Sequence, residues 1–227
     1  PHNAVMPNAT IRAVTCHAGT LDIVDLPAPR PAKGQLVINV ARAGICGSDL
    51  HARNHADELH SVLSEIGYPD FISSGTTVVM GHEFCGEVGE RAKGTPKTFK
   101  EGTPVAIFPM LRAKGGVHMT GLSPLAPGGY AEQTLAEASM SFVIPNGLSM
   151  DLAALTEPMA VALHAVRRSE IDSRPHGVWV GIPGAPDSMN ATSPAGSSWL
   201  VCDAVTKAFG AGAPEPVTVT VIDGQPD

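Results

Sequence analysis

Short alternations of apolar and polar residues, separated by Pro and Gly turns, fill the first 145 residues of the chain. The clearest is QLVINVARA at residues 35–43, which alternates as a half-buried strand does. Other strands are predicted at residues 11–14, 21–24, 78–88, 104–108, 128–135 and 142–144. Many short strands at this spacing predict a mainly β fold with a few helices, arranged in a barrel-like way.

The pattern changes to a helical one after residue 148. Either Ser149 or Asp151 can cap a helix here, and Pro158 predicts a break or kink within it. Further along, residues 203–209 could form a short helix, and VTVTVI at 217–222 predicts a strand. The apolar positions of the first helix recur at helical spacing, at Leu152, Leu155, Met159, Leu163 and Val166.

Composition excludes several classes of protein. The 227 residues carry a net charge of -7 and no basic cluster, which argues against nucleic-acid binding. There is no apolar run long enough for a membrane helix and no N-terminal secretion signal, so a cytoplasmic protein without membrane contact is expected. The four cysteines are too widely spaced to indicate a disulfide scaffold, which leaves core, metal-ligand or nucleophile roles.

Three motifs occur in a fixed order: GICGSDLH at 44–51, GHEFCGEV at 81–88 and TEP at 156–158. With VAI at 105–107 and PGGYAE at 127–132, this order resembles the medium-chain zinc-dependent dehydrogenases across residues 10–171. The resemblance implies a GroES-like catalytic domain. It also implies an alcohol or polyol dehydrogenase that transfers hydride from a small alcohol to NAD(P).

The resemblance further implies one catalytic zinc ion per chain. Cys46, His82 and Glu157 would be its ligands, and Glu83 would coordinate transiently as substrate exchanges. Three protein ligands with one open position are what a catalytic zinc needs. Taken singly, Cys46 or His82 is better explained as a core residue, which is also our interpretation of Cys85, whereas the ordered set favours zinc.

Three more residues of the first motif have roles implied by the same resemblance. Ser48 and His51 would relay the alcohol proton from the zinc to solvent, because the metal lowers the pKa of the alcohol. Asp49 would accept the free N–H of His82 and fix its tautomer. The simpler alternatives are a helix-capping Ser48 and a solvated His51.

Two stretches between the motifs bear on further metal sites. Residues 52–80 carry His55, Asp57, Glu58 and His60, but a solvated surface loop is a better interpretation than a second metal site. Residues 89–128 contain no cysteine, which excludes the four-cysteine structural zinc of many family members.

The resemblance breaks where a nucleotide-binding domain should begin. Residues 178–186 read VWVGIPGAP, and this G-x-x-G with two prolines cannot form the G-x-G-x-x-G turn of a Rossmann domain. We therefore expect a catalytic domain at 1–171, a short bridge at 172–200, and a helix and strand at 201–227 that return to the catalytic domain. Without a complete Rossmann domain, the helix at 152–166 should expose apolar surface, and a homo-oligomer is one outcome.

Two alternative functions remain open. The chain could be a zinc enzyme that uses no nicotinamide, such as a hydrolase or lyase. It could also be a non-catalytic zinc-binding remnant. In the favoured interpretation the partner is a small alcohol or carbonyl compound. The sequence does not identify this compound, and it does not distinguish NAD from NADP as the cofactor.

Overall fold

The computed structural model describes residues 9–145 and 147–168, and contacts divide the chain into two units, 1–160 and 161–227. Of the second unit only residues 161–168 are described. The helix predicted at 203–209, the strand predicted at 217–222, and the bridge and return segment at 172–200 and 201–227 lie outside the described residues. The predicted domain limits therefore stay predictions.

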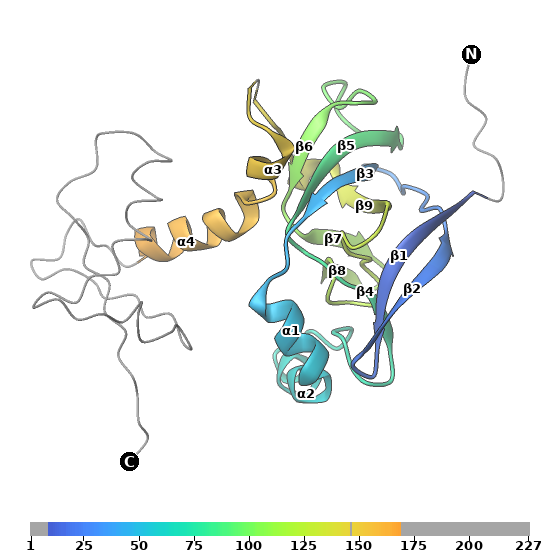
Figure 1. The fold of residues 1–227 in the computed structure, drawn as a ribbon, viewed down its shortest axis with the longest axis vertical. Helices are drawn as coiled ribbons and strands as arrows, with labels where there is room; N and C mark the ends of the chain where they lie inside the picture. The colour runs from blue at the N-terminus through green and yellow to red at the C-terminus, as the bar shows by residue number, and fades with distance from the viewer. Residues whose placement is uncertain (1–8, 146, 169–227) are drawn as a thin grey trace, which may run out of the picture. The chain divides into compact units, whose positions relative to one another are not determined.

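A five-stranded antiparallel sheet forms the centre of the first unit (Figure 1). Its strand order is β10-β6-β5-β3-β9, so the strand predicted best from the sequence, β3 (Gln35–Ala43), is paired on both sides. Strands β3 and β5 contribute fully or almost fully buried side chains to one hydrophobic cluster, among them Leu36, Ile38, Phe84 and Val88. The other strands are β5 (Phe84–Arg91), β6 (Pro104–Ile107), β9 (Gln133–Glu137) and β10 (Ser141–Val143).

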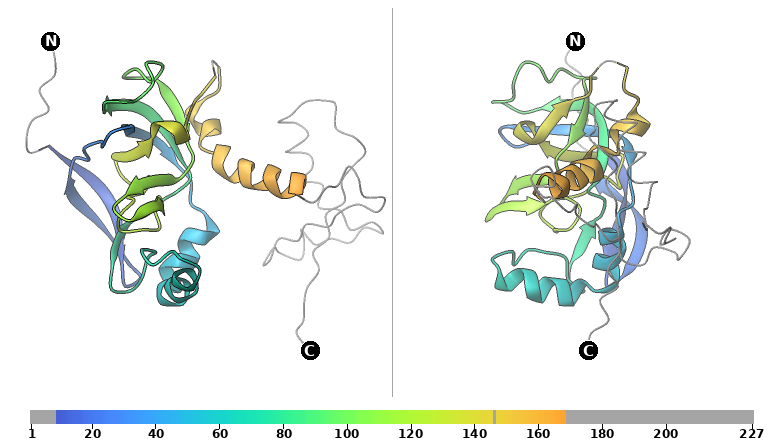
Figure 2. Two further views of the ribbon diagram at one scale, coloured as in Figure 1. Left: turned by 180° about the vertical axis from the view of Figure 1, so that it is seen from behind. Right: turned by 90° about the vertical axis from the view of Figure 1, so that its left-hand side faces the viewer.

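A three-stranded sheet and a hairpin complete the β structure. The smaller sheet has the order β2-β1-β4 and comprises β1 (Thr10–His17), β2 (Thr20–Pro27) and β4 (Thr77–Val79). Strands β7 (Met110–Ala113) and β8 (Gly116–Met119) form the hairpin. These elements confirm the mainly β fold, and Figure 2 shows the same arrangement from behind and from one side.

A buried carboxylate fastens the hairpin to the large sheet. Glu137 of β9 accepts hydrogen bonds from Gln35 Nε2 of β3 at 2.9 Å and from the Arg112 backbone N–H of β7 at 3.0 Å. Its second oxygen accepts the Arg112 guanidinium at 2.7 Å. These donors satisfy a buried charge that would otherwise be costly.

Helices occupy part of the stretch that the sequence suggested was a loop. Residues 52–80 contain the end of α1 (Gly47–Asn54) and all of α2 (Ala56–Glu65), so the loop prediction was wrong there. Leu59 and Leu63 of α2 lie on one face and pack against the cluster that holds Ile72 and Val78. A single short apolar face among charged and polar residues gave too weak a helical pattern.

The predicted strand at 78–88 is two strands with a break between them. Strand β4 ends at Val79 and β5 begins at Phe84, and Gly81 in the break has a φ of +94°, in the left-handed region that favours glycine. The break places His82 and Glu83 outside both strands. An uninterrupted strand would have paired both of these residues in a sheet.

The helical region predicted after residue 148 consists of α3 (Met150–Ala153) and α4 (Thr156–Arg168). Ser149 caps α3 as expected, because its hydroxyl accepts the Leu152 N–H. The break precedes Thr156 rather than falling at Pro158, which lies in the first turn of α4, where backbone N–H groups have no helical partner.

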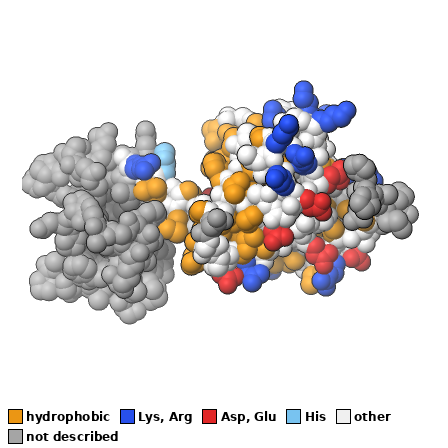
Figure 3. Space-filling model, turned by 90° about the horizontal axis from the view of Figure 1, so that it is seen from above, with side chains coloured by type: hydrophobic (Ala, Val, Ile, Leu, Met, Phe, Trp, Pro, Cys, Tyr) orange, Lys and Arg blue, Asp and Glu red, His pale blue; other side chains and the backbone are white. Residues whose placement is uncertain are grey.

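Apolar side chains are exposed in this helical region, as the sequence led us to expect. Leu152 is 57% and Leu155 49% exposed, and Val161 in the second unit is 59% exposed. Figure 3 shows hydrophobic side chains, in orange, at the surface of the described part.

Candidate metal centre

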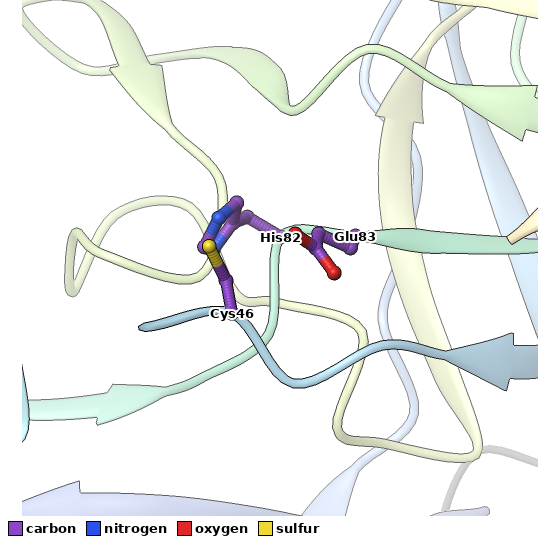
Figure 4. A group of neighbouring side chains, drawn as sticks. All are labelled: Cys46, His82 and Glu83. Carbon is purple, nitrogen blue, oxygen red and sulfur yellow. The ribbon is translucent and has the colours of Figure 1, made fainter. Parts of the chain in front are cut away.

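Two chain segments supply the side chains of the candidate centre (Figure 4). Cys46 immediately precedes α1, and His82 and Glu83 lie in the break between β4 and β5. Gly44 allows the two segments to approach, since a Cβ atom there would overlap the Glu83 carboxylate. The local backbone thus explains why this carboxylate can lie beside the cysteine segment.

The ligand atoms of Cys46, His82 and Glu83 all lie within 4.8 Å of one another. His82 is 3% and Glu83 7% exposed, whereas Cys46 is half-buried. Within residues 9–145 and 147–168, this is the one such group of three potential metal ligands. The structure therefore brings together three of the four ligands that the sequence suggested.

The fourth, Glu157, is near the group without belonging to it. It lies in the first turn of α4 and is half-buried. Burial raises the pKa of Glu157, the charge of His82 opposes this, and Glu83 adds to it. The charges of His82 and Glu83 thus both affect the ionisation of the Glu157 carboxylate. The role of Glu157 as a metal ligand stays a prediction.

Asp49 holds His82 in a defined orientation. Both side chains are buried, and His82 Nδ1 lies 3.0 Å from Asp49 Oδ1. Burial raises the pKa of Asp49, but hydrogen bonds from His82, Tyr130 and the Cys46 backbone outweigh it and hold the pKa below its usual value. Asp49 is therefore an ionised carboxylate that accepts a hydrogen bond from the Nδ1–H of His82, which leaves Nε2 for a metal.

The charge of Asp49 also makes His82 a stronger base. Burial lowers the pKa of His82, but the hydrogen bond and charge of Asp49, helped by Cys46, raise it to about 9. In the metal-free protein near pH 7 the imidazole thus carries both protons. A metal at Nε2 must displace one of them, so metal binding weakens as the pH falls.

The two predicted relay residues both lie on α1, and both are exposed. Ser48 Oγ is 3.2 Å from His82 Nε2, at the ring atom that faces the cysteine segment. His51 is exposed, and its ring stacks on that of His55 with centroids 4.7 Å apart. Ser48 thus lies beside His82 at the start of this short helix, and His51 lies three residues further along it.

The side chains of the suggested second metal site are engaged separately. His55 Nδ1 is 3.2 Å from Glu58, Asp57 accepts the Ser74 N–H at 2.7 Å, and His60 Nδ1 is 3.0 Å from the Phe71 carbonyl oxygen. Among the residues that the structure describes, these side chains do not form a group of three potential metal ligands.

One residue of the centre was missed in the sequence. Tyr130 OH donates to Asp49 Oδ2 at 2.8 Å and lies 2.9 Å from the Gly44 carbonyl oxygen. We had interpreted its GGYAE motif only as a strand, although strand β9 begins later, at Gln133. The Gly-Gly pair before the tyrosine was the available signal, because it allows close backbone approach.

Comparison with known proteins decides the family. The model of the alcohol dehydrogenase GroES-like domain matches residues 32–146, half of the chain. The chain belongs to this family. The (R,R)-butanediol dehydrogenase of Bacillus subtilis is 35% identical over 152 residues, which cover 63% of this chain and 42% of the relative. A crystal structure of 2R,3R-butanediol dehydrogenase from Bacillus subtilis has a TM-score of 0.54 at 28% identity and covers 75% of this chain and 49% of that one.

The C-terminal part of the chain matches the model of a different family. The model of the type VII secretion system ESX-1 transport TM domain B covers residues 147–227. The ESX-5 secretion system ATPase EccB5 of Mycobacterium marinum is 62% identical over 65 residues, which cover 28% of this chain and 13% of that protein. Among the described residues, no helix is both long and apolar enough to cross a membrane.

Proposed function

We propose that the dehydrogenase-like part of the chain is the catalytic domain of a zinc-dependent alcohol or polyol dehydrogenase. The observation that carries this proposal is the convergence of the potential metal ligands Cys46, His82 and Glu83. Within this group the buried Asp49 orients His82. Butanediol, sorbitol and arabitol-phosphate dehydrogenases among its relatives support the same class of substrate. The chain covers less than two thirds of the length of each of these relatives. The dehydrogenase activity is therefore proposed for the whole protein.

The donor set fits a catalytic zinc ion. Cys46 as a thiolate and His82 through Nε2 would bind it, with Glu157 as the third ligand and Glu83 able to replace a ligand during substrate exchange. A bound zinc would act as a Lewis acid that lowers the pKa of an alcohol. Asp49 keeps the Nδ1 proton on His82, so the ring presents Nε2 to the ion.

Ser48 and His51 would carry the proton that the alcohol loses. The Ser48 hydroxyl lies 3.2 Å from His82 Nε2, the atom that would bind the metal, so it would lie near an alcohol bound to that metal. His51, three residues further along α1, is exposed and can release it to water. Hydride would pass to NAD(P), the cofactor that the family resemblance implies.

We further propose that the chain is a composite of two unrelated segments. The two family models meet without overlap at residues 146 and 147, and the last of the three dehydrogenase motifs in the sequence is TEP at 156–158. An EccB-like segment then occupies the place where the cofactor domain would follow. This proposal gives weight to the alternative of a zinc-binding remnant, because Cys46, His82 and Glu83 all lie in the first segment.

A cysteine replacement tests the metal assignment. The metal-free chain should bind one zinc ion, and Cys46→Ser should weaken binding by on the order of 100-fold or more, since even partners behind the ligands are worth 10–100-fold. Cys85→Ala is the matched control: Cys85 is buried against Met150, outside the ligand group, and its loss should leave zinc binding intact. Equal zinc content in Cys46→Ser and the parent chain, by elemental analysis, would remove Cys46 from the site.

A serine replacement tests the relay. In a form of the enzyme that carries a cofactor domain, Ser48→Ala should lower turnover by roughly 100-fold, the scale of lost acid–base catalysis. Zinc content should not change, because Ser48 is not a ligand. Unaltered turnover at every pH measured would exclude Ser48 from the proton path.

Cofactor titration tests the composite organisation. A polypeptide of these 227 residues should bind NAD(H) or NADP(H) at best in the millimolar range, about -4 kcal/mol, because residues 172–227 show no phosphate-binding turn. Zinc binding without cofactor binding fits this proposal and a zinc enzyme that uses no nicotinamide, and activity assays separate those two. Micromolar NAD(H) binding by calorimetry would refute the composite organisation.

A further inference from the structure

Tyr130 is joined to the histidine segment through both its backbone and its ring. Its N–H donates to the Met80 carbonyl at 2.9 Å, and the preceding Gly129 N–H donates to the Gly81 carbonyl at 2.7 Å. The ring lies against Gly81, where a Cβ atom would overlap it. The tyrosine therefore has a fixed position relative to His82, which follows Gly81 directly.

The hydroxyl of the same residue reaches the cysteine segment. It lies 2.8 Å from Asp49 Oδ2 and 2.9 Å from the Gly44 carbonyl oxygen, two residues before Cys46. Both of these atoms are acceptors and the phenol has one proton, so it must keep that proton to donate to either of them. Burial and the nearby Asp49 carboxylate raise the pKa of Tyr130, which keeps it protonated.

Asp49 receives donors from three directions. Oδ1 accepts from His82, and Oδ2 accepts from the Cys46 backbone N–H at 3.1 Å and from the tyrosine hydroxyl. A buried carboxylate needs such donors to stay charged and in place. Without the phenol, Oδ2 would keep only the hydrogen bond from the Cys46 backbone N–H, three residues earlier in the chain. The carboxylate could then turn away from His82.

We propose that Tyr130 is a positioning residue of the metal centre, whose hydroxyl fixes the cysteine segment to the histidine segment and aims Asp49 at His82. This inference rests on the proposed zinc-binding function. The hydroxyl holds Asp49 and the cysteine segment in place, which the packing of the ring alone does not do. The ring contacts Gly81 and belongs to the core cluster around Met80, and a phenylalanine would keep those contacts.

The chain contains two tyrosines, and this provides a matched pair of variants. Tyr130→Phe removes the hydroxyl at the centre, whereas Tyr68→Phe removes one from a side chain that is 50% exposed. Zinc affinity is measured by competition with a chelator, and the visible absorption bands of the cobalt(II)-loaded protein report the ligand geometry. Circular dichroism confirms that each variant is folded.

Tyr130→Phe should weaken zinc binding by roughly 10–100-fold, the usual effect of losing a partner behind a metal ligand, and should alter the cobalt bands. Tyr68→Phe should match the parent chain in both. Parent-like affinity and bands in Tyr130→Phe would overturn the positioning role while leaving the zinc assignment intact. A parent chain that binds no zinc would overturn the zinc assignment and this role together.

If Tyr130→Phe does not fold, fluorotyrosine provides the second measurement. In the Tyr68→Phe background, fluorotyrosine labels Tyr130 alone, and its fluorine resonance should shift when one equivalent of zinc is added to the metal-free protein. An unchanged resonance at full zinc loading would contradict the coupling between the phenol and the centre.

Discussion

The buried contact between Asp49 and His82 is the interaction on which the candidate centre depends. It joins α1 to the break between β4 and β5, and so fixes the two ligand segments relative to one another. A carboxylate with 3% side-chain exposure would be costly without its donors. The same pair fixes the histidine tautomer, which connects the packing of the domain directly to its metal chemistry.

The sequence predicted the centre better than the elements around it. Cys46, His82 and Glu83 stand in contiguous motifs, so their approach follows once the family is recognised. Strand β3 was predicted with its observed limits, although its first four residues are all buried where an alternation was expected. Glu157 could not be placed from sequence, because its distance from the other ligands depends on where α4 begins.

The errors have local physical causes. The prediction of one strand at 78–88 failed because apolar residues continue through the break, and only the left-handed Gly81 marks it. Strands β7 and β8 have four residues each, too few for an alternation to stand out. Tyr130 was missed because its significance comes from contacts with Gly44 and Asp49, more than eighty residues away along the chain.

X-ray absorption at the zinc edge of the purified chain tests the central claim most directly. The account predicts one zinc ion with a single sulfur ligand at about 2.3 Å and nitrogen or oxygen ligands at about 2.0–2.2 Å. The single sulfur would be that of Cys46, because of the three cysteines in the described part of the chain it alone belongs to the ligand group. A shell with no sulfur, or with several, would contradict the account.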